Sequence, residues 1–287
     1  MRKSDFTITQ QQVAWRLKFS KLIYVNQCEH LHGIYSMLPD EHEWLFDTGE
    51  SLLAQVEQGA PSTILYSSLM EDAYALSLAL AWKAREMTIA AVWALNQRYL
   101  PTAAVAARAA LESTSVSIDL AMKHAAMKNK LIALQASGQN GGAEAFDLLK
   151  KFEDETVKAT WGRRGDTIEK HIRAKNVLSY RDSVLKDAGD NPTFGPEILE
   201  MHRHVYDLLS SMAHPSADGH QVYWRFSTVD SSGPSTRVKL AARADFREPF
   251  QAERIDAVLW ALGWSVAHVI RAWQVLEQER LEAAAGL

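Results

Sequence analysis

The fold is decided by two consecutive stretches, STILYSSLMEDAYALSLALAWKAREMTIAAVWALNQR over residues 62–98 and PTAAVAARAALESTSVSIDLAMKHAAMKNKLIALQAS over residues 101–137. Both are rich in alanine and leucine, which are strong helix formers. Pro101 suits the first turn of a helix, where its missing N–H removes no intrahelical hydrogen bond. Because only a very short link joins the two predicted helices, we expect them to pack as an antiparallel hairpin.

Helical periodicity continues through most of the remaining chain. Apolar spacing predicts further helices over residues 8–37, 41–58, 143–161, 166–180, 197–213 and 249–284. The last helix should pack on the long hairpin through Ile255, Val258, Leu262, Val266 and Val269. After His214-Pro215, aromatic and β-branched residues predict a β-hairpin over about 221–243. The predicted fold class is therefore all-α, a multi-helix bundle with long antiparallel helices and one small β-hairpin after the His214-Pro215 helix end.

The composition is that of a globular protein. With 287 residues, 47% of them hydrophobic, the chain can bury a substantial core. We expect one domain overall, with an N-terminal helical segment over 1–60 packed on a main helical bundle over 61–287. The net charge of -4 does not indicate a nucleic-acid partner, although a local basic groove is compatible with it.

Three features indicate a cytoplasmic protein that is not in a membrane. Cys28 is the single cysteine, which excludes an intramolecular disulfide and a cysteine zinc cluster. The polar N-terminus lacks the apolar core of a signal peptide. Charged residues interrupt the longest apolar stretch, residues 73–95, which we interpret as a buried helix.

Two sets of polar side chains are candidates for chemistry. Arg108 and Glu112 stand four residues apart in an alanine-rich helix and share one face, as a helix ion pair or as the lining of a polar pocket. Tyr206, Ser210 and His214 form a second stripe at the same spacing. It is either a hydrogen-bond relay in which His214 acts as acid or base, or a capping network that supports the following hairpin.

The two stripes are expected to meet. Polar groups on apolar helices are costly when buried apart, and they satisfy one another when the helices are neighbours. We therefore predict one polar cluster, with Arg108 and Glu112 largely buried. Its five residues form the candidate catalytic site, or else a structural network: Arg108, Glu112, Tyr206, Ser210 and His214.

Other common sites are not indicated. The histidines at 202, 204, 214 and 220 lack the spacing of a helical zinc motif, and no phosphate-binding or dinucleotide-binding glycine motif is present. We predict no metal and no cofactor. Basic residues between Lys150 and Lys175 alternate with acidic ones, which favours a solvated face over a nucleic-acid groove.

Two family resemblances add to these patterns. Arg108-Ala-Ala-Leu-Glu112, followed by Tyr206-Asp-Leu-Leu-Ser210-Ser-Met-Ala-His214-Pro215, resembles a family of uncharacterised bacterial helical proteins over about residues 65–225. That resemblance implies a helical bundle and no particular activity. The helix end at His214 is also distantly similar to the HEPN superfamily, which includes metal-independent RNases whose hallmark is an arginine separated from a following histidine by four to six residues.

The chain departs from the HEPN pattern. The positions five to seven before His214 hold Leu209, Leu208 and Asp207, so Arg108 would have to supply the cation. Three functions stay open: a non-catalytic helical scaffold or sensor in a bacterial defence or stress module, a metal-independent HEPN-like RNase using His214 and Arg108, and a small-molecule-binding helical bundle. The expected binding partner is a protein or RNA, and a homodimer is an open alternative.

Overall fold

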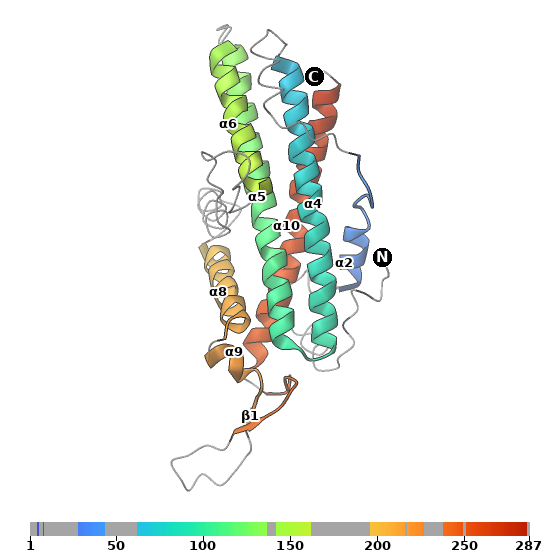
Figure 1. Ribbon diagram of the computed structural model, residues 1–287, viewed down its shortest axis with the longest axis vertical. Coiled ribbons are helices and arrows are strands. Elements are labelled where there is room, and N and C mark those ends of the chain that lie inside the picture. The colour runs from blue at the N-terminus through green and yellow to red at the C-terminus, as the bar shows by residue number, and fades with distance from the viewer. Residues whose placement is uncertain are drawn as a thin grey trace. The chain divides into compact units, whose positions relative to one another are not determined.

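The computed structural model describes residues 5, 8, 28–43, 62–136, 142–161, 196–215, 217–226, 238–248 and 251–285. Its helices, labelled in Figure 1, are α2 (Cys28–Tyr35), α4 (Ser62–Asn96), α5 (Leu100–Ala136), α6 (Gly142–Trp161), α8 (Pro196–Ala213), α9 (Ala217–Gln221) and α10 (Ala252–Ala284). Helices account for 84% of the described residues, which confirms the all-α class.

Five predicted helices are confirmed with small shifts of their ends. They correspond to α4, α5, α6, α8 and α10. Helix α2 covers part of the helix predicted over 8–37, and α9 was not predicted. Residues 41–43 are not helical, and the remainder of the helix predicted over 41–58 lies outside the described residues, as does the helix predicted over 166–180.

The β structure in the described residues is smaller than expected. Strands β1 (Trp224–Phe226) and β2 (Val238–Leu240) pair antiparallel, with Trp224 opposite Leu240 and Phe226 opposite Val238. Each strand is three residues long, and residues 227–237 lie outside the described part of the chain. The hairpin predicted over about 221–243 is therefore not supported as an element. One reason is local: residues 217–221 form a helical turn, so the chain becomes extended only at Trp224.

The link between α4 and α5 is a tight helix end. The N–H of Tyr99 donates to the carbonyl of Ala94 (2.8 Å), and the N–H of Arg98 donates to the carbonyl of Leu95 (2.9 Å). This pair of bonds is a Schellman motif, which requires a left-handed residue after the helix. Arg98 takes that conformation with a φ of 61°, at a position where glycine is usual. The motif reverses the chain directly into α5.

The chain divides into two compact units, each drawn from three ranges of sequence. Unit 1 comprises Met1–Met37, Lys83–Glu112 and Ala188–Ala267, and unit 2 comprises Leu38–Trp82, Ser113–Asp187 and His268–Leu287. The long helices α4, α5 and α10 therefore each contribute residues to both units. The organisation predicted from sequence, a segment over 1–60 packed on a bundle over 61–287, stays a prediction.

In unit 2, hydrogen bonds fix the direction of the helices. Ser77 bonds Ser117 (2.9 Å) and, farther along, the Tyr66 hydroxyl bonds His124 (3.1 Å), so α4 and α5 are antiparallel there. Around these bonds lies an apolar core from α4, α5, α6 and α10. Its buried members are Leu69, Met70, Ala73, Leu76, Leu120, Ala121, Met127, Leu149, Phe152, Ala272 and Leu276.

Unit 1 contains α2, α8 and α9, together with the parts of α4, α5 and α10 that fall within its sequence ranges. The Tyr35 hydroxyl of α2, fully buried, hydrogen-bonds Thr88 of α4 (3.2 Å). The Gln251 amide donates to the carbonyl of Val222 (3.1 Å), and Arg254 of α10 donates to Gln221 at the end of α9 (3.0 Å). These bonds tie the segment after α8 to the start of α10.

The predicted apolar face of α10 is confirmed, since all five of its side chains are buried: Ile255, Val258, Leu262, Val266 and Val269. Among the described residues, α10 is also the one helix long and apolar enough to cross a membrane by length and composition. In that window, 72% of the residues are buried inside the protein. Its apolar character is accounted for by packing within the fold.

We predict that two leucines of α10, one buried and one exposed, contribute very differently to the free energy of unfolding. Leu276 is fully buried, whereas Leu281 on the same helix is 55% exposed. Leu276→Ala should lower the free energy of unfolding by about 2–5 kcal/mol, because it leaves a cavity in the core. Leu281→Ala should change it by less than about 0.5 kcal/mol. Urea denaturation measures both, and equal losses would contradict this packing.

Candidate functional site

The core of the candidate site is an ion pair on one face of α5. Nε of Arg108 donates to Oε1 of Glu112 at 2.8 Å, and the two side chains are 26% and 24% exposed. The four-residue spacing predicted from sequence thus places the guanidinium and the carboxylate together. The prediction of a largely buried pair is too strong, since about a quarter of each side chain remains exposed.

Tyr206 of α8 closes the pair into a triangle of hydrogen bonds. Its hydroxyl donates to Oε1 of Glu112 (3.0 Å) and accepts from Nη2 of Arg108 (3.2 Å). The guanidinium carbon also lies 5.2 Å from the centroid of the Tyr206 ring, within the range of a cation–π contact. Tyr206 is only 5% exposed, so the hydrogen bonds of its hydroxyl group involve a buried side chain.

His214 stands at the edge of the triangle, just after α8. Its Nε2 lies 3.5 Å from Nη1 of Arg108, and the residue is exposed. Because a guanidinium can only donate, this contact requires an unprotonated Nε2 on the imidazole. The lone pair that would make His214 a base through Nε2 is therefore directed at Arg108.

The end of α8 is held by close packing as well as by Pro215. A residue before proline disfavours helical conformation, and α8 accordingly ends at Ala213. A Cβ at Gly219 of α9 would lie 2.5 Å from the carbonyl oxygen of His214, closer than any side chain tolerates. Glycine at 219 therefore allows α9 to approach the end of α8 and fixes the backbone that carries His214.

Ser210 bonds the helix backbone instead of extending the polar stripe. Its hydroxyl donates to the carbonyl of Tyr206 at 2.7 Å, one turn back along α8. Serine hydroxyls on helices commonly make this local bond. The proton of Ser210 is thus not directed at the Tyr206 phenol. The structure brings Arg108, Glu112, Tyr206 and His214 together, and it gives Ser210 a backbone role.

The electrostatics of the triangle favour a charged arginine and a neutral tyrosine. Burial opposes the charge of Arg108, but the charge and hydrogen bond of Glu112, together with Tyr206, leave the guanidinium pKa raised above its ordinary value. Burial, reinforced by Glu112, raises the pKa of the Tyr206 phenol. The phenol therefore stays protonated at neutral pH and can donate to the carboxylate.

The other histidines of α8 point to opposite sides, as their two-residue spacing requires. His202 is buried, with its ring edge-on to Trp260 (5.9 Å between centroids) and Trp264 (5.4 Å) of α10. His204 is exposed and pairs with Glu253 at 3.0 Å. Among the described residues, no group of three or more histidine, cysteine or acidic side chains is placed to hold a metal ion.

Comparison of the chain with protein-family models, with curated proteins and with solved structures finds no match. The function therefore has to be argued from the geometry.

Sequence reasoning missed a second polar group, centred on His124 of α5 in unit 2. His124 is 1% exposed, bonds the Tyr66 hydroxyl (3.1 Å), and lies 4.0 Å from Glu279 of α10. Glu279 in turn accepts from Lys128 at 2.6 Å. A signal was present in the sequence, because His124 falls on the same helical face as Leu120 and Met127.

Burial sets the protonation of this second group. Burial lowers the pKa of His124. The negative charge of Glu279 acts in the opposite direction, and the positive charge of Lys128 lowers the pKa further. Burial, reinforced by Glu279, raises the pKa of Tyr66 to about 12. Neutral His124 and neutral Tyr66 are therefore the forms that the folded state favours.

We predict that Glu112→Ala destabilises the protein by about 1–3 kcal/mol, because it leaves Arg108 and the Tyr206 phenol without their shared acceptor. The partial exposure of the pair keeps the loss below the roughly 3–5 kcal/mol expected for a fully buried charge. Glu86→Ala, at an exposed position of α4, is the matched control and should change little. Thermal and urea unfolding measure both variants. A loss below about 0.5 kcal/mol for Glu112→Ala would mean that the triangle holds nothing together.

The buried His124 makes a prediction about pH. A lowered pKa in the folded state gives stability that is complete above the unfolded value, about 6.5, and is lost as pH falls through the folded value. Between about pH 7 and pH 5, His124→Gln should therefore lose less stability than wild type. Lys128, Glu279 and Tyr66 are present in both proteins, so their contributions largely cancel. His220→Gln, at an exposed position, should keep the wild-type pH dependence. Identical slopes for all three proteins would contradict the burial of a neutral His124.

Proposed function

We propose that the protein is a non-catalytic helical scaffold, in which the Arg108–Glu112–Tyr206 triangle joins α8 to α5. The observation that supports this is the closure of the triangle. Glu112 accepts from both of the other members, and Tyr206 also accepts from Arg108. A guanidinium already neutralised by a carboxylate at 2.8 Å is a poor site for a substrate phosphate.

A group of aromatic and arginine side chains in unit 1 supports a protein partner for such a scaffold. Trp93 of α4 is 55% exposed, and its ring lies 5.9 Å from that of Tyr99. The guanidinium of Arg243 lies over the Tyr99 ring at 5.4 Å. Tryptophan, tyrosine and arginine are the residues that contribute most to protein–protein binding energy. We propose this group as the contact surface of the scaffold.

The location and assembly of the protein remain part of the proposal. We propose a cytoplasmic location, which a single cysteine suits. A bacterial defence or stress module and a homodimer are compatible settings for a scaffold.

A metal-independent RNase of HEPN type is the second candidate, favoured by one contact. Nη1 of Arg108 and Nε2 of His214 lie 3.5 Å apart beside solvent, so a cation and a potential base share one exposed edge. Two features weigh against it. Glu112 compensates the charge of Arg108, and the Nε2 lone pair of His214 points at the guanidinium rather than at open space.

The third candidate, a small-molecule-binding bundle, is favoured by a cleft between α5 and α6 that lies apart from the triangle in sequence.

We predict that the wild-type protein does not cleave RNA and that His214→Ala leaves its thermal stability nearly unchanged, because His214 is exposed and its contact is long. Tyr206→Phe should cost about 1 kcal/mol, the usual worth of a lost hydrogen bond. The measurements are unfolding temperature and cleavage of a labelled single-stranded RNA.

The matched control is His220→Ala, a second exposed histidine close in sequence. RNA cleavage that survives in His220→Ala and disappears in His214→Ala, at equal stability, would replace the scaffold with the RNase.

A further inference from the structure

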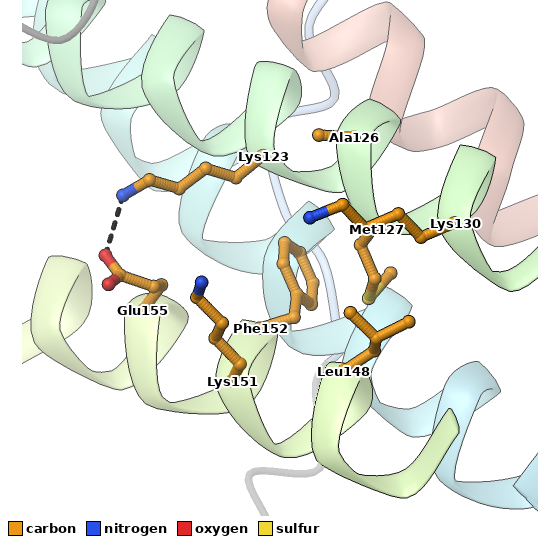
Figure 2. A pocket seen from close by; sticks show the side chains of 8 residues that line it. All are labelled: Lys123, Ala126, Met127, Lys130, Leu148, Lys151, Phe152 and Glu155. Carbon is orange, nitrogen blue, oxygen red and sulfur yellow. Dashed lines mark hydrogen bonds and ion pairs between the residues drawn. The ribbon is translucent and has the colours of Figure 1, made fainter. Parts of the chain in front are cut away.

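Helices α5 and α6 of unit 2 enclose a cleft of about 190 Å³, shown in Figure 2. Each helix contributes four lining residues. They are Lys123, Ala126, Met127 and Lys130 from α5, and Leu148, Lys151, Phe152 and Glu155 from α6. The cleft therefore combines an apolar interior with three ammonium groups.

The floor of the cleft is part of the apolar core of unit 2. Met127 and Phe152 are 5% and 3% exposed, and both belong to the apolar core of unit 2. Leu148 packs against that core from α6. Side chains anchored in this way give a ligand a pre-formed apolar surface, as in most small-molecule sites.

The three lysines of the cleft differ in their partners. Lys123 donates to Glu155 at 2.6 Å and pairs with Asp119 at 2.7 Å, so its charge is already neutralised. Lys130 and Lys151 are exposed, and neither makes an ion pair within the described part of the chain. In Figure 2 these two side chains come from opposite walls of the cleft, Lys130 from α5 and Lys151 from α6.

Three acidic residues of α6 lie one helical turn from Lys151: Asp147, Asp154 and Glu155. The carboxylate of Glu155 pairs with Lys123. Among the described residues, Lys151 makes no ion pair with any of the three. The acidic residues of α10, Glu279 and Glu282, are engaged by Lys128 instead, at 2.6 and 3.1 Å.

We propose that this cleft binds a small aromatic carboxylate. The ring lies on Met127, Leu148 and Phe152, and the carboxylate lies between the ammonium groups of Lys130 and Lys151. The size fits, because a cavity of about 150 Å³ holds a benzene-sized molecule, and the cleft is somewhat larger. Nucleotides and other drug-sized ligands need about 300 Å³ or more. None of the residues that line this site belongs to the Arg108 triangle.

The probe is phenylacetate, titrated into the full-length protein labelled at its methionine methyl groups. The readout is the NMR signal of Met127, assigned with Met127→Leu. We expect a saturable shift with a Kd of about 1 mM, a modest affinity suited to so small a ligand. Benzylamine, with the same ring and the opposite charge, should not produce it.

Two pairs of variants separate the cleft from the general surface. The double variant Lys130→Met with Lys151→Met should weaken binding about fivefold, as expected for partly solvated ion pairs, while Lys150→Met leaves it unchanged. Ala126→Phe should fill the cleft and abolish the shift. Ala125→Phe, at an exposed neighbouring position outside the cleft lining, should not.

Three outcomes would overturn the proposal: no saturable shift, an equal shift with benzylamine, or equal weakening by Lys150→Met. If phenylacetate fails while a short acidic peptide containing phenylalanine shifts Met127, the cleft is an anchor point for a protein partner and the small-molecule assignment is wrong.

Discussion

The carboxylate of Glu112 accepts hydrogen bonds from two helices, from Arg108 of α5 and from Tyr206 of α8. Removing any one member leaves at least one polar group without its partner in a site that is about three-quarters buried or more. Packing also orients the C-terminal half of α8, because Val205, Leu209 and Met212 are buried. Ser210 and Ser211 direct their hydroxyls at the backbone of α8 itself. The close approach of Gly219 couples the end of α8 to α9. The shared acceptor and this packing together fix the segment that carries His214.

The same constraint operates in unit 2 with different residues. Helices made largely of alanine and leucine bury whatever polar group falls on their inner face, so such groups must meet one another. Ser77 meets Ser117, and His124 meets Tyr66 beside the pair of Glu279 and Lys128. At the α5–α6 cleft, Lys123 engages Glu155, and Lys130 and Lys151 make no ion pair among the described residues. The role of a buried polar residue in this protein is therefore indicated by the partner that pairs with it.

Sequence patterns anticipated the long helices well because alanine–leucine composition and apolar spacing act locally. Four of the five cluster residues also meet as expected, because the four-residue spacing aligns polar side chains within each helix and the buried polar groups of α5 and α8 then hydrogen-bond one another. The prediction that Ser210 joins the cluster was wrong, because a local hydrogen bond to the helix backbone competes with any distant partner. The left-handed Arg98 was missed because its position does not hold the glycine that usually marks such a helix end. Helix α9 was missed because five residues are too few to show a helical period. His124 was overlooked because a histidine among apolar residues gives no sign of what it faces. The alternation of basic and acidic residues predicts a solvated face that includes Lys151, but the surroundings of Lys151 depend on the packing of α6 against α5.

A double-mutant cycle between Glu112→Gln and Tyr206→Phe tests most directly whether the triangle is one structural unit. The free energy of unfolding is measured for wild type, the two single variants and the double variant. If Glu112 and Tyr206 hold α5 and α8 together, the coupling energy should be about 0.5–3 kcal/mol, the range for directly interacting side chains. Additive losses, with no coupling beyond about 0.3 kcal/mol, would contradict the account, because Glu112 and Tyr206 would then contribute to stability independently.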